Sequence, residues 1–191
     1  DNELVSLTPA TEKQILGFAI SSNVNLEQVI SYALECEHDV LVLDSTRNLG
    51  GNWSELVTTP DFSMMRDAIR ILRKMKKEEM VELIYFGGVR SGTDTAKLIG
   101  LGANAVVLGV CAGLAMGGEI QGHELNFSSN YSDQDRVQGL VNIVKANLGE
   151  ATMMARCTGK TNLYNVEPED LCAITGSTSK VTGIPFAGKC A

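Results

Sequence analysis

The sequence predicts an α/β fold with about four parallel strands and a C-terminal helical extension. Short apolar runs of strand length alternate with segments of helical periodicity as far as Gly109, and each of the last two apolar runs ends in glycine. Strands that alternate with helices form a parallel sheet with right-handed crossovers. Four such strands are half of an eight-stranded barrel, so we expect half of a (β/α)8 barrel.

The first βαβ unit is predicted from residues 14–44. Residues 14–20 form a strand candidate, and residues 26–35 carry apolar side chains at helical spacing. Asn25 precedes this helix as a candidate N-cap. Residues 39–44 are an apolar strand that ends in Asp44, whose carboxylate either caps its loop or contacts a ligand.

A long loop and a long helix follow. The loop spans residues 45–61, and loops of this length in compact domains are usually functional or mobile. Trp53 in this loop either covers a ligand or anchors the loop by burial. Residues 62–80 are predicted to form a helix with an apolar stripe rich in methionine, typical of core packing.

Residues 81–111 form the most informative stretch. They predict a strand over 81–86, a glycine turn, a helix capped by Thr93 or Asp94, and a strand over 105–108. The carboxyl ends of parallel strands meet at one edge, where α/β folds bind ligands. The two glycine turns would therefore offer backbone N–H groups to one anion, and a phosphate is the anion we expect there. The alternative is that the glycines only make tight turns.

The chain changes character after the last predicted strand. Residues 122–132 are polar and loop-like, residues 134–155 predict a long helix, and residues 167–171 predict a short one. The tail from residue 175 is small and polar and is expected to be irregular. We therefore divide the chain into a half barrel, 1–111, and a C-terminal extension, 112–191, that is helical and irregular.

Composition limits the class of protein. The 191 residues are enough for about one domain, and 44% of them are apolar without a run long enough to span a bilayer. A net charge of −7 argues against nucleic acid and anionic membranes as main partners. Five scattered cysteines favour reduced thiols, so we expect a soluble, cytoplasmic protein. The chain begins with Asp1, so we expect a processed product or part of a longer polypeptide.

Metal and nucleophile sites are weakly supported. The two histidines, His38 and His123, lie far apart in the sequence, so a histidine-based metal site is not expected. Cys111 lies at the mouth of the last strand, and His123 is the only base near it in sequence. A nucleophile needs an adjacent base, and we disfavour this pair. No catalytic residue is assigned.

The glycine-rich stretch resembles a known family. Residues 87–92, 100–106 and Gly109 are similar to the last two strands of FMN-dependent (β/α)8 barrels. Residues 39–51, together with 136–160, 169–171 and 182–185, resemble the FMN-binding domain of glutamate synthase and its relatives. The C-terminal segments are what point to the glutamate synthase branch.

The resemblance implies where the flavin phosphate binds. In such barrels the phosphate is held by backbone N–H groups of the last two βα loops. We call the corresponding residues of this chain the anion cradle: Gly87, Gly88, Val89, Arg90, Gly109, Val110 and Cys111. Arg90 would add charge to the phosphate, pair with a nearby acid, or remain a surface cation.

Several departures from the family pattern stand out. The strand position of the family's flavin-contacting lysine aligns with Phe18, give or take one residue, and the glycine loop after Asp44 is altered. Residues 112–133 contain no cysteine, so no iron–sulfur cluster is expected. The first four βα units of a barrel are missing, so another chain or an absent N-terminal half should complete the structure.

Two functions follow from the resemblance. The first is an FMN-dependent oxidoreductase domain of glutamate-synthase type, acting in glutamate or nitrogen metabolism. The second is a non-catalytic, barrel-derived subunit that binds a phosphate ligand and serves assembly or regulation. The missing lysine favours the second function, while the intact anion cradle favours the first.

Overall fold

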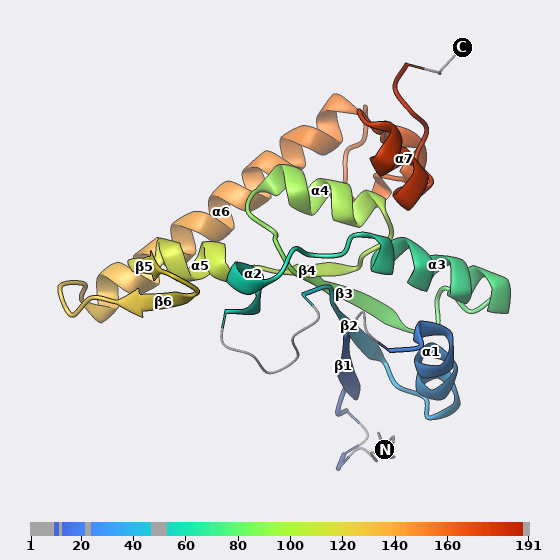
Figure 1. The fold of residues 1–191 in the computed structure, drawn as a ribbon, viewed down its shortest axis with the longest axis horizontal. Helices are drawn as coiled ribbons and strands as arrows, with labels where there is room; N and C mark the ends of the chain where they lie inside the picture. Colours follow the sequence, from blue (N-terminus) through green and yellow to red (C-terminus); the bar gives the residue numbers. More distant parts are fainter. Residues whose placement is uncertain (1–9, 12, 22–23, 47–52, 189–191) are drawn as a thin grey trace.

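The main sheet has four parallel strands. The computed structural model describes residues 10–11, 13–21, 24–46 and 53–188. The strands are β1 (Gly17–Ser21), β2 (Val40–Asp44), β3 (Glu82–Phe86) and β4 (Ala105–Val107), and they pair in sequence order (Figure 1). This arrangement confirms the predicted α/β fold with four parallel strands.

Three helices connect these strands and cover one face of the sheet. They are α1 (Leu26–Glu35), α3 (Ser63–Met75) and α4 (Gly92–Gly100). Alternate strand residues point toward them because side chains of a strand alternate between faces. The fully buried core therefore combines strand and helix side chains: Leu41, Leu43, Leu83, Tyr85, Ile30, Met65 and Leu72.

The opposite face of the sheet carries the other half of each strand. Pairing aligns one residue from each strand in a row close to the carboxyl ends: Ser21, Asp44, Phe86 and Val107. Val107 is 36% exposed, whereas the core residues on the helix-covered face are buried. In a (β/α)8 barrel this face lines the interior.

Two helix boundaries differ from the prediction. Helix α3 ends at Met75 rather than at residue 80, because Lys76 adopts a left-handed conformation with a φ of 56°. The N-cap of α4 is Ser91, not Thr93 or Asp94, and its hydroxyl accepts a hydrogen bond from the Asp94 N–H. The cap therefore lies one residue before Gly92, which is the first residue of the helix.

A β-hairpin follows the short helix α5 (Val110–Ala115). Its strands are β5 (Gly118–Gln121) and β6 (Glu124–Phe127), and the prediction of a loop over residues 122–132 was wrong at this point. Gly122 supplies the positive φ, 64°, that the two-residue turn needs. The pattern was hard to detect because Leu125 is the only buried apolar side chain of the described hairpin strands.

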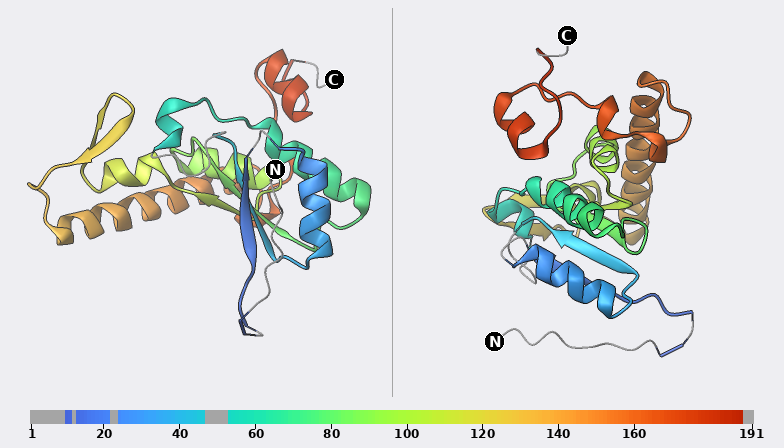
Figure 2. Two further views of the ribbon diagram at one scale, coloured as in Figure 1. Left: turned by 60° about the horizontal axis from the view of Figure 1, so that its bottom comes forward. Right: turned by 90° about the vertical axis from the view of Figure 1, so that its right-hand side faces the viewer.

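The C-terminal extension is built around one long helix, α6 (Asp133–Cys157). Ser132 and Asp135 form a capping box at its start, and the helix lies across α4 and α5 (Figure 1). Figure 2 shows that the hairpin and α6 both project beyond the sheet. No helix in the described part of the chain is long and apolar enough to cross a membrane.

The predicted irregular tail contains a helix. After two short 3-10 turns, Leu163–Asn165 and Pro168–Asp170, helix α7 spans Gly176–Thr182. Its residues are small and polar and have weak helix propensity, so the sequence pattern did not predict a helix here. A tertiary contact stabilises its end, because the buried Arg66 Nε donates a 2.8 Å hydrogen bond to the Thr182 carbonyl oxygen.

Candidate functional site

The two glycine loops lie next to each other at the carboxyl edge of the sheet. Phe86 at the end of β3 pairs with Val107 of β4, so the loops that follow them start side by side. Gly87 and Gly88 have φ values of 132° and 70°, which side chains rarely tolerate. A Cβ atom at Gly87 would also lie 2.1 Å from the Ser45 Oγ. Only glycine therefore fits at the start of the anion cradle.

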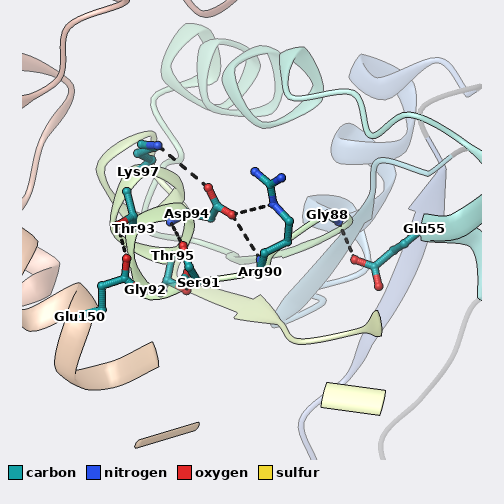
Figure 3. Close-up of polar contacts among 10 residues, drawn as sticks. All are labelled: Glu55, Gly88, Arg90, Ser91, Gly92, Thr93, Asp94, Thr95, Lys97 and Glu150. Carbon is teal, nitrogen blue, oxygen red and sulfur yellow. Dashed lines mark hydrogen bonds and ion pairs between the residues drawn. The ribbon is translucent and has the colours of Figure 1, made fainter. Parts of the chain in front are cut away.

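A carboxylate lies in the anion cradle. Helix α2 (Ser54–Val57) carries Glu55, whose Oε1 accepts a 2.5 Å hydrogen bond from the Gly88 N–H. The Oε2 of the same carboxylate accepts a 2.6 Å hydrogen bond from the Val110 N–H. Figure 3 shows Glu55 directed at Gly88. Backbone N–H groups from both predicted loops thus converge on one anionic group.

Gly109 leaves room for that anion. A Cβ atom at Gly109 would lie 1.8 Å from the Glu55 Oε2 and 3.0 Å from the Phe86 ring. Any larger residue would push into the volume that the carboxylate fills. The glycine therefore allows the close approach of an anion to the backbone, as sequence analysis proposed for this turn.

Arg90 points to a neighbouring acid rather than to Glu55. Its backbone N–H and its Nε each lie 3.3 Å from the Asp94 Oδ2, and Lys97 lies 4.0 Å from the same carboxylate (Figure 3). The Arg90 side chain is 82% exposed. Val89, by contrast, is buried in the core and fixes the loop beneath the cradle. Neither Arg90 nor Val89 donates a hydrogen bond to the Glu55 carboxylate.

Cys111 is not activated as a nucleophile. Burial raises the pKa of its thiol, and the negative charge of Glu55 raises this pKa further. His123 does not serve it as a base, since its Nδ1 lies 3.2 Å from the Leu56 carbonyl oxygen. The disfavoured pairing of these two residues receives no support.

Asp44 caps its own loop. The side chain is 3% exposed, and its Oδ1 accepts hydrogen bonds from the Thr46 N–H at 2.8 Å and the Thr46 hydroxyl at 2.5 Å. These contacts correspond to the loop-capping alternative. The altered glycine loop over residues 47–52, with Gly50 and Gly51, lies outside the described residues.

Trp53 anchors the described end of the long loop. Its ring lies 6.1 Å from the ring of Phe127 on the hairpin, and its six-membered ring lies over Gly113. Helix α2 begins at the next residue, so this contact positions Glu55 at the anion cradle. Sequence reasoning missed Glu55 because one glutamate in a polar loop carries no distinguishing pattern.

Strand β1 shows which residues near Phe18 face the inside of the half barrel. Phe18 faces the helices and packs edge-on against His38, with ring centroids 5.1 Å apart. Because faces alternate along a strand, the inner-face positions next to it are Gly17 and Ala19. Both positions lie within one residue of Phe18, as the resemblance allowed, and β1 contains no lysine.

A second carboxylate lies close to the anion cradle but serves the packing of α4. Glu150 of α6 accepts a 2.9 Å hydrogen bond from the Gly92 N–H and another from the Thr93 hydroxyl (Figure 3). Two hydrogen bonds lower the pKa of Glu150. The one from the Thr93 hydroxyl has the larger effect, and the one from the Gly92 N–H has the next largest. This contact joins α6 to the first turn of α4.

Acid should weaken this contact. Because the pKa of Glu150 is lower in the folded state, its stabilisation is present above the ordinary glutamate pKa and is lost as the pH falls through the folded value. We expect Glu150→Gln to reduce the free energy of unfolding at pH 7 and to flatten its fall below about pH 4. Denaturant titrations at pH 7 and below about pH 4 would measure the free energy of unfolding of the wild type and the variant. An equal fall of this free energy in both proteins would contradict the prediction.

Comparison with known proteins identifies the family. The model of the conserved region in glutamate synthase matches residues 2–123, which include the sheet and both glycine loops. The chain belongs to this family. One relative, the glutamate synthase large subunit-like protein of Rhizobium meliloti (strain 1021), is 32% identical over 191 aligned positions. That alignment covers 82% of this chain and 43% of the relative, so the chain spans less than half of the relative's length.

Two more distantly similar proteins agree with the fold of this chain. The pre-mycofactocin synthase of Mycolicibacterium smegmatis is 29% identical over 147 positions, covering 75% of this chain and 30% of that protein. The flavin-binding domain of baker's yeast flavocytochrome b2 has a TM-score of 0.53 at 24% identity, over 78% of this chain and 33% of that one. The chain therefore has the fold of part of a (β/α)8 barrel.

Proposed function

We propose that this chain is the phosphate-binding half of an FMN-dependent oxidoreductase barrel of glutamate-synthase type. One observation carries the proposal, namely that the N–H groups of Gly88 and Val110 converge on a single anion. Two N–H donors from neighbouring βα loops are a common arrangement for a phosphate. Membership of the glutamate synthase family supports flavin as the carrier of that phosphate.

The residues of the anion cradle fit this group. Gly88 and Val110 would donate to phosphate oxygens, while Gly87 and Gly109 keep side chains out of the space. Arg90 lies at the rim as an exposed cation whose charge Asp94 partly offsets. FMN, when bound, supplies hydride and electron transfer, and the protein's part is to bind and orient it.

A second function is favoured by the strand β1. Gly17, Ala19 and Ser21, the inner-face positions of β1, carry no charge that could stabilise a reduced flavin. A barrel with this feature would bind a phosphate ligand without flavin redox chemistry and serve assembly or regulation. The two functions differ in whether bound FMN is reduced by an electron donor.

The open edges of the sheet support a partner for this half barrel. Among the described strands, β1 and β4 are the edges, and exposed edges promote unwanted pairing. One side of α6 also exposes an apolar row: Val137, Leu140, Val141, Val144 and Leu148. We propose that further βα units, from another chain or from the same polypeptide, cover these surfaces. The relative's greater length is consistent with this proposal.

The location and the substrate class are part of the proposal. Cys36, Cys111 and Cys157 are free thiols in the described part of the chain, which favours a reducing compartment such as the cytoplasm. Glutamate formation is the reaction that family membership favours. The prediction that no iron–sulfur cluster binds to this chain stays a prediction.

Flavin titration of the intact natural protein tests the proposal. We expect FMN to bind, with a flavin absorbance band near about 450 nm that bleaches when an electron donor is added. Binding without bleaching by any donor would favour the non-catalytic function. Absence of FMN binding, with the protein folded, would contradict the flavin proposal.

A further inference from the structure

Glu55 competes for the same donors that the proposed function gives to phosphate. Its two carboxylate oxygens accept the Gly88 and Val110 N–H groups at 2.5 and 2.6 Å. Both bonds are charge-assisted and short. An N–H group directed at a carboxylate oxygen is not free for a phosphate oxygen. The anion cradle therefore holds either Glu55 or a phosphate.

We propose that Glu55 is an internal anionic plug, which a flavin phosphate must displace from the Gly88 and Val110 N–H groups in order to bind. This inference rests on the proposed function and adds a regulatory step to it. Like charges disfavour simultaneous occupation, since a phosphate placed on the same two N–H groups would lie in contact with the carboxylate. The space left by Gly109, where a Cβ would lie 1.8 Å from the Glu55 Oε2, is too small for both.

Helix α2 is suited to such a displacement. It has only four residues, and Glu55 itself is only partly buried. Val57 at its end is 52% exposed. The Thr58 hydroxyl donates to the carbonyl oxygens of Ser54 and Thr46 and holds the end of this segment. A segment of a single helical turn can open locally at a lower cost than a long helix.

The plug also acts on its surroundings as a negative charge. It is one of the causes that raise the pKa of the Cys111 thiol, after burial. Removing the charge while keeping the shape is therefore the informative substitution. Glu55→Gln keeps an acceptor oxygen but removes the charge, and Glu55→Ala removes both the charge and the bulk.

The affinity for three probes tests the plug. We expect Glu55→Gln and Glu55→Ala to bind FMN about tenfold tighter or more than the wild type, since the carboxylate that accepts the two competing charge-assisted hydrogen bonds is removed. Inorganic phosphate should gain affinity in the same way. Riboflavin, which has no phosphate, should bind all three proteins equally. Titration of the intact protein followed by flavin fluorescence, with phosphate as a competitor, gives these constants.

A charge-matched control separates the plug from a general effect of charge. Glu119→Gln removes an exposed carboxylate on β5 and should leave all three affinities unchanged. Circular dichroism and thermal melting confirm that each variant is folded.

The possible results separate the inference from the function. Unchanged or weaker FMN binding in both folded Glu55 variants, with binding by the wild type, would overturn the plug and leave the proposed function standing. A gain for riboflavin equal to that for FMN would also overturn it. If neither the wild type nor the variants bind FMN or phosphate, the proposed function and the plug both fail.

Discussion

Gly88→Val is expected to abolish FMN binding, with at least a hundredfold loss of affinity. Gly88 has a φ of 70°, so a β-branched side chain there would force the loop out of its conformation. Its Cβ would also lie 2.8 Å from the Pro60 Cγ. The Gly88 N–H would no longer point at the anion, and losing a charge-assisted bond and its geometry costs about 1.5–3 kcal/mol or more. Flavin fluorescence titration measures the affinity.

Two further variants make this result interpretable. Gly109→Ala would fill the anion cradle from the other loop at a position with a negative φ of −86°, and should also weaken FMN binding strongly. Gly149→Ala on α6 is the control, because a Cβ there meets nothing within 4 Å. Unchanged FMN affinity in folded Gly88→Val would show that the cradle is assigned to the wrong residues.

Gly92→Ala is expected to cause a large loss of stability. A Cβ at Gly92 would lie 2.2 Å from the Asn147 carbonyl oxygen and 2.5 Å from the Ala151 nitrogen, both in the backbone of α6. Backbone atoms cannot move aside as a side chain can, so α4 and α6 would have to separate. Overpacking of this kind typically costs about 1–3 kcal/mol.

Thermal melting measures this effect. A loss of about 1–3 kcal/mol corresponds to a fall in Tm of roughly 2–12 °C for a chain of this size. Gly149→Ala again serves as the control on the same helix, and it should not lower the Tm. A Tm for Gly92→Ala within about 1 °C of the wild type would contradict the close packing of the two helices.

The strand and helix order was predictable because local patterns determine it. Apolar runs such as residues 40–44 and 82–86 are short and bounded by polar or glycine residues, and Asn25 caps α1 as expected. The meeting of the two glycine loops was also predictable, since glycines at the ends of neighbouring parallel strands must lie at one edge.

Other features depend on tertiary contacts that no local pattern shows. Helix α7 is made of weak helix formers and is held by Arg66 from a distant part of the chain. The hairpin buries only Leu125 among the apolar side chains of its described strands, so the alternation of apolar and polar residues along these strands is weak. Glu55 reaches the cradle only because Trp53 packs on the hairpin. Which of residues 17–19 faces the inside of the half barrel depends on the register, which strand pairing sets.

The most direct test of the central claim compares FMN with riboflavin on the intact wild-type protein. The two ligands share the flavin ring and differ in the phosphate that the Gly88 and Val110 N–H groups are proposed to hold. We predict that FMN binds at least about tenfold tighter than riboflavin, and that excess inorganic phosphate reduces the difference. Equal affinities for the two ligands, unaffected by phosphate, would contradict the claim that these two loops bind the flavin phosphate.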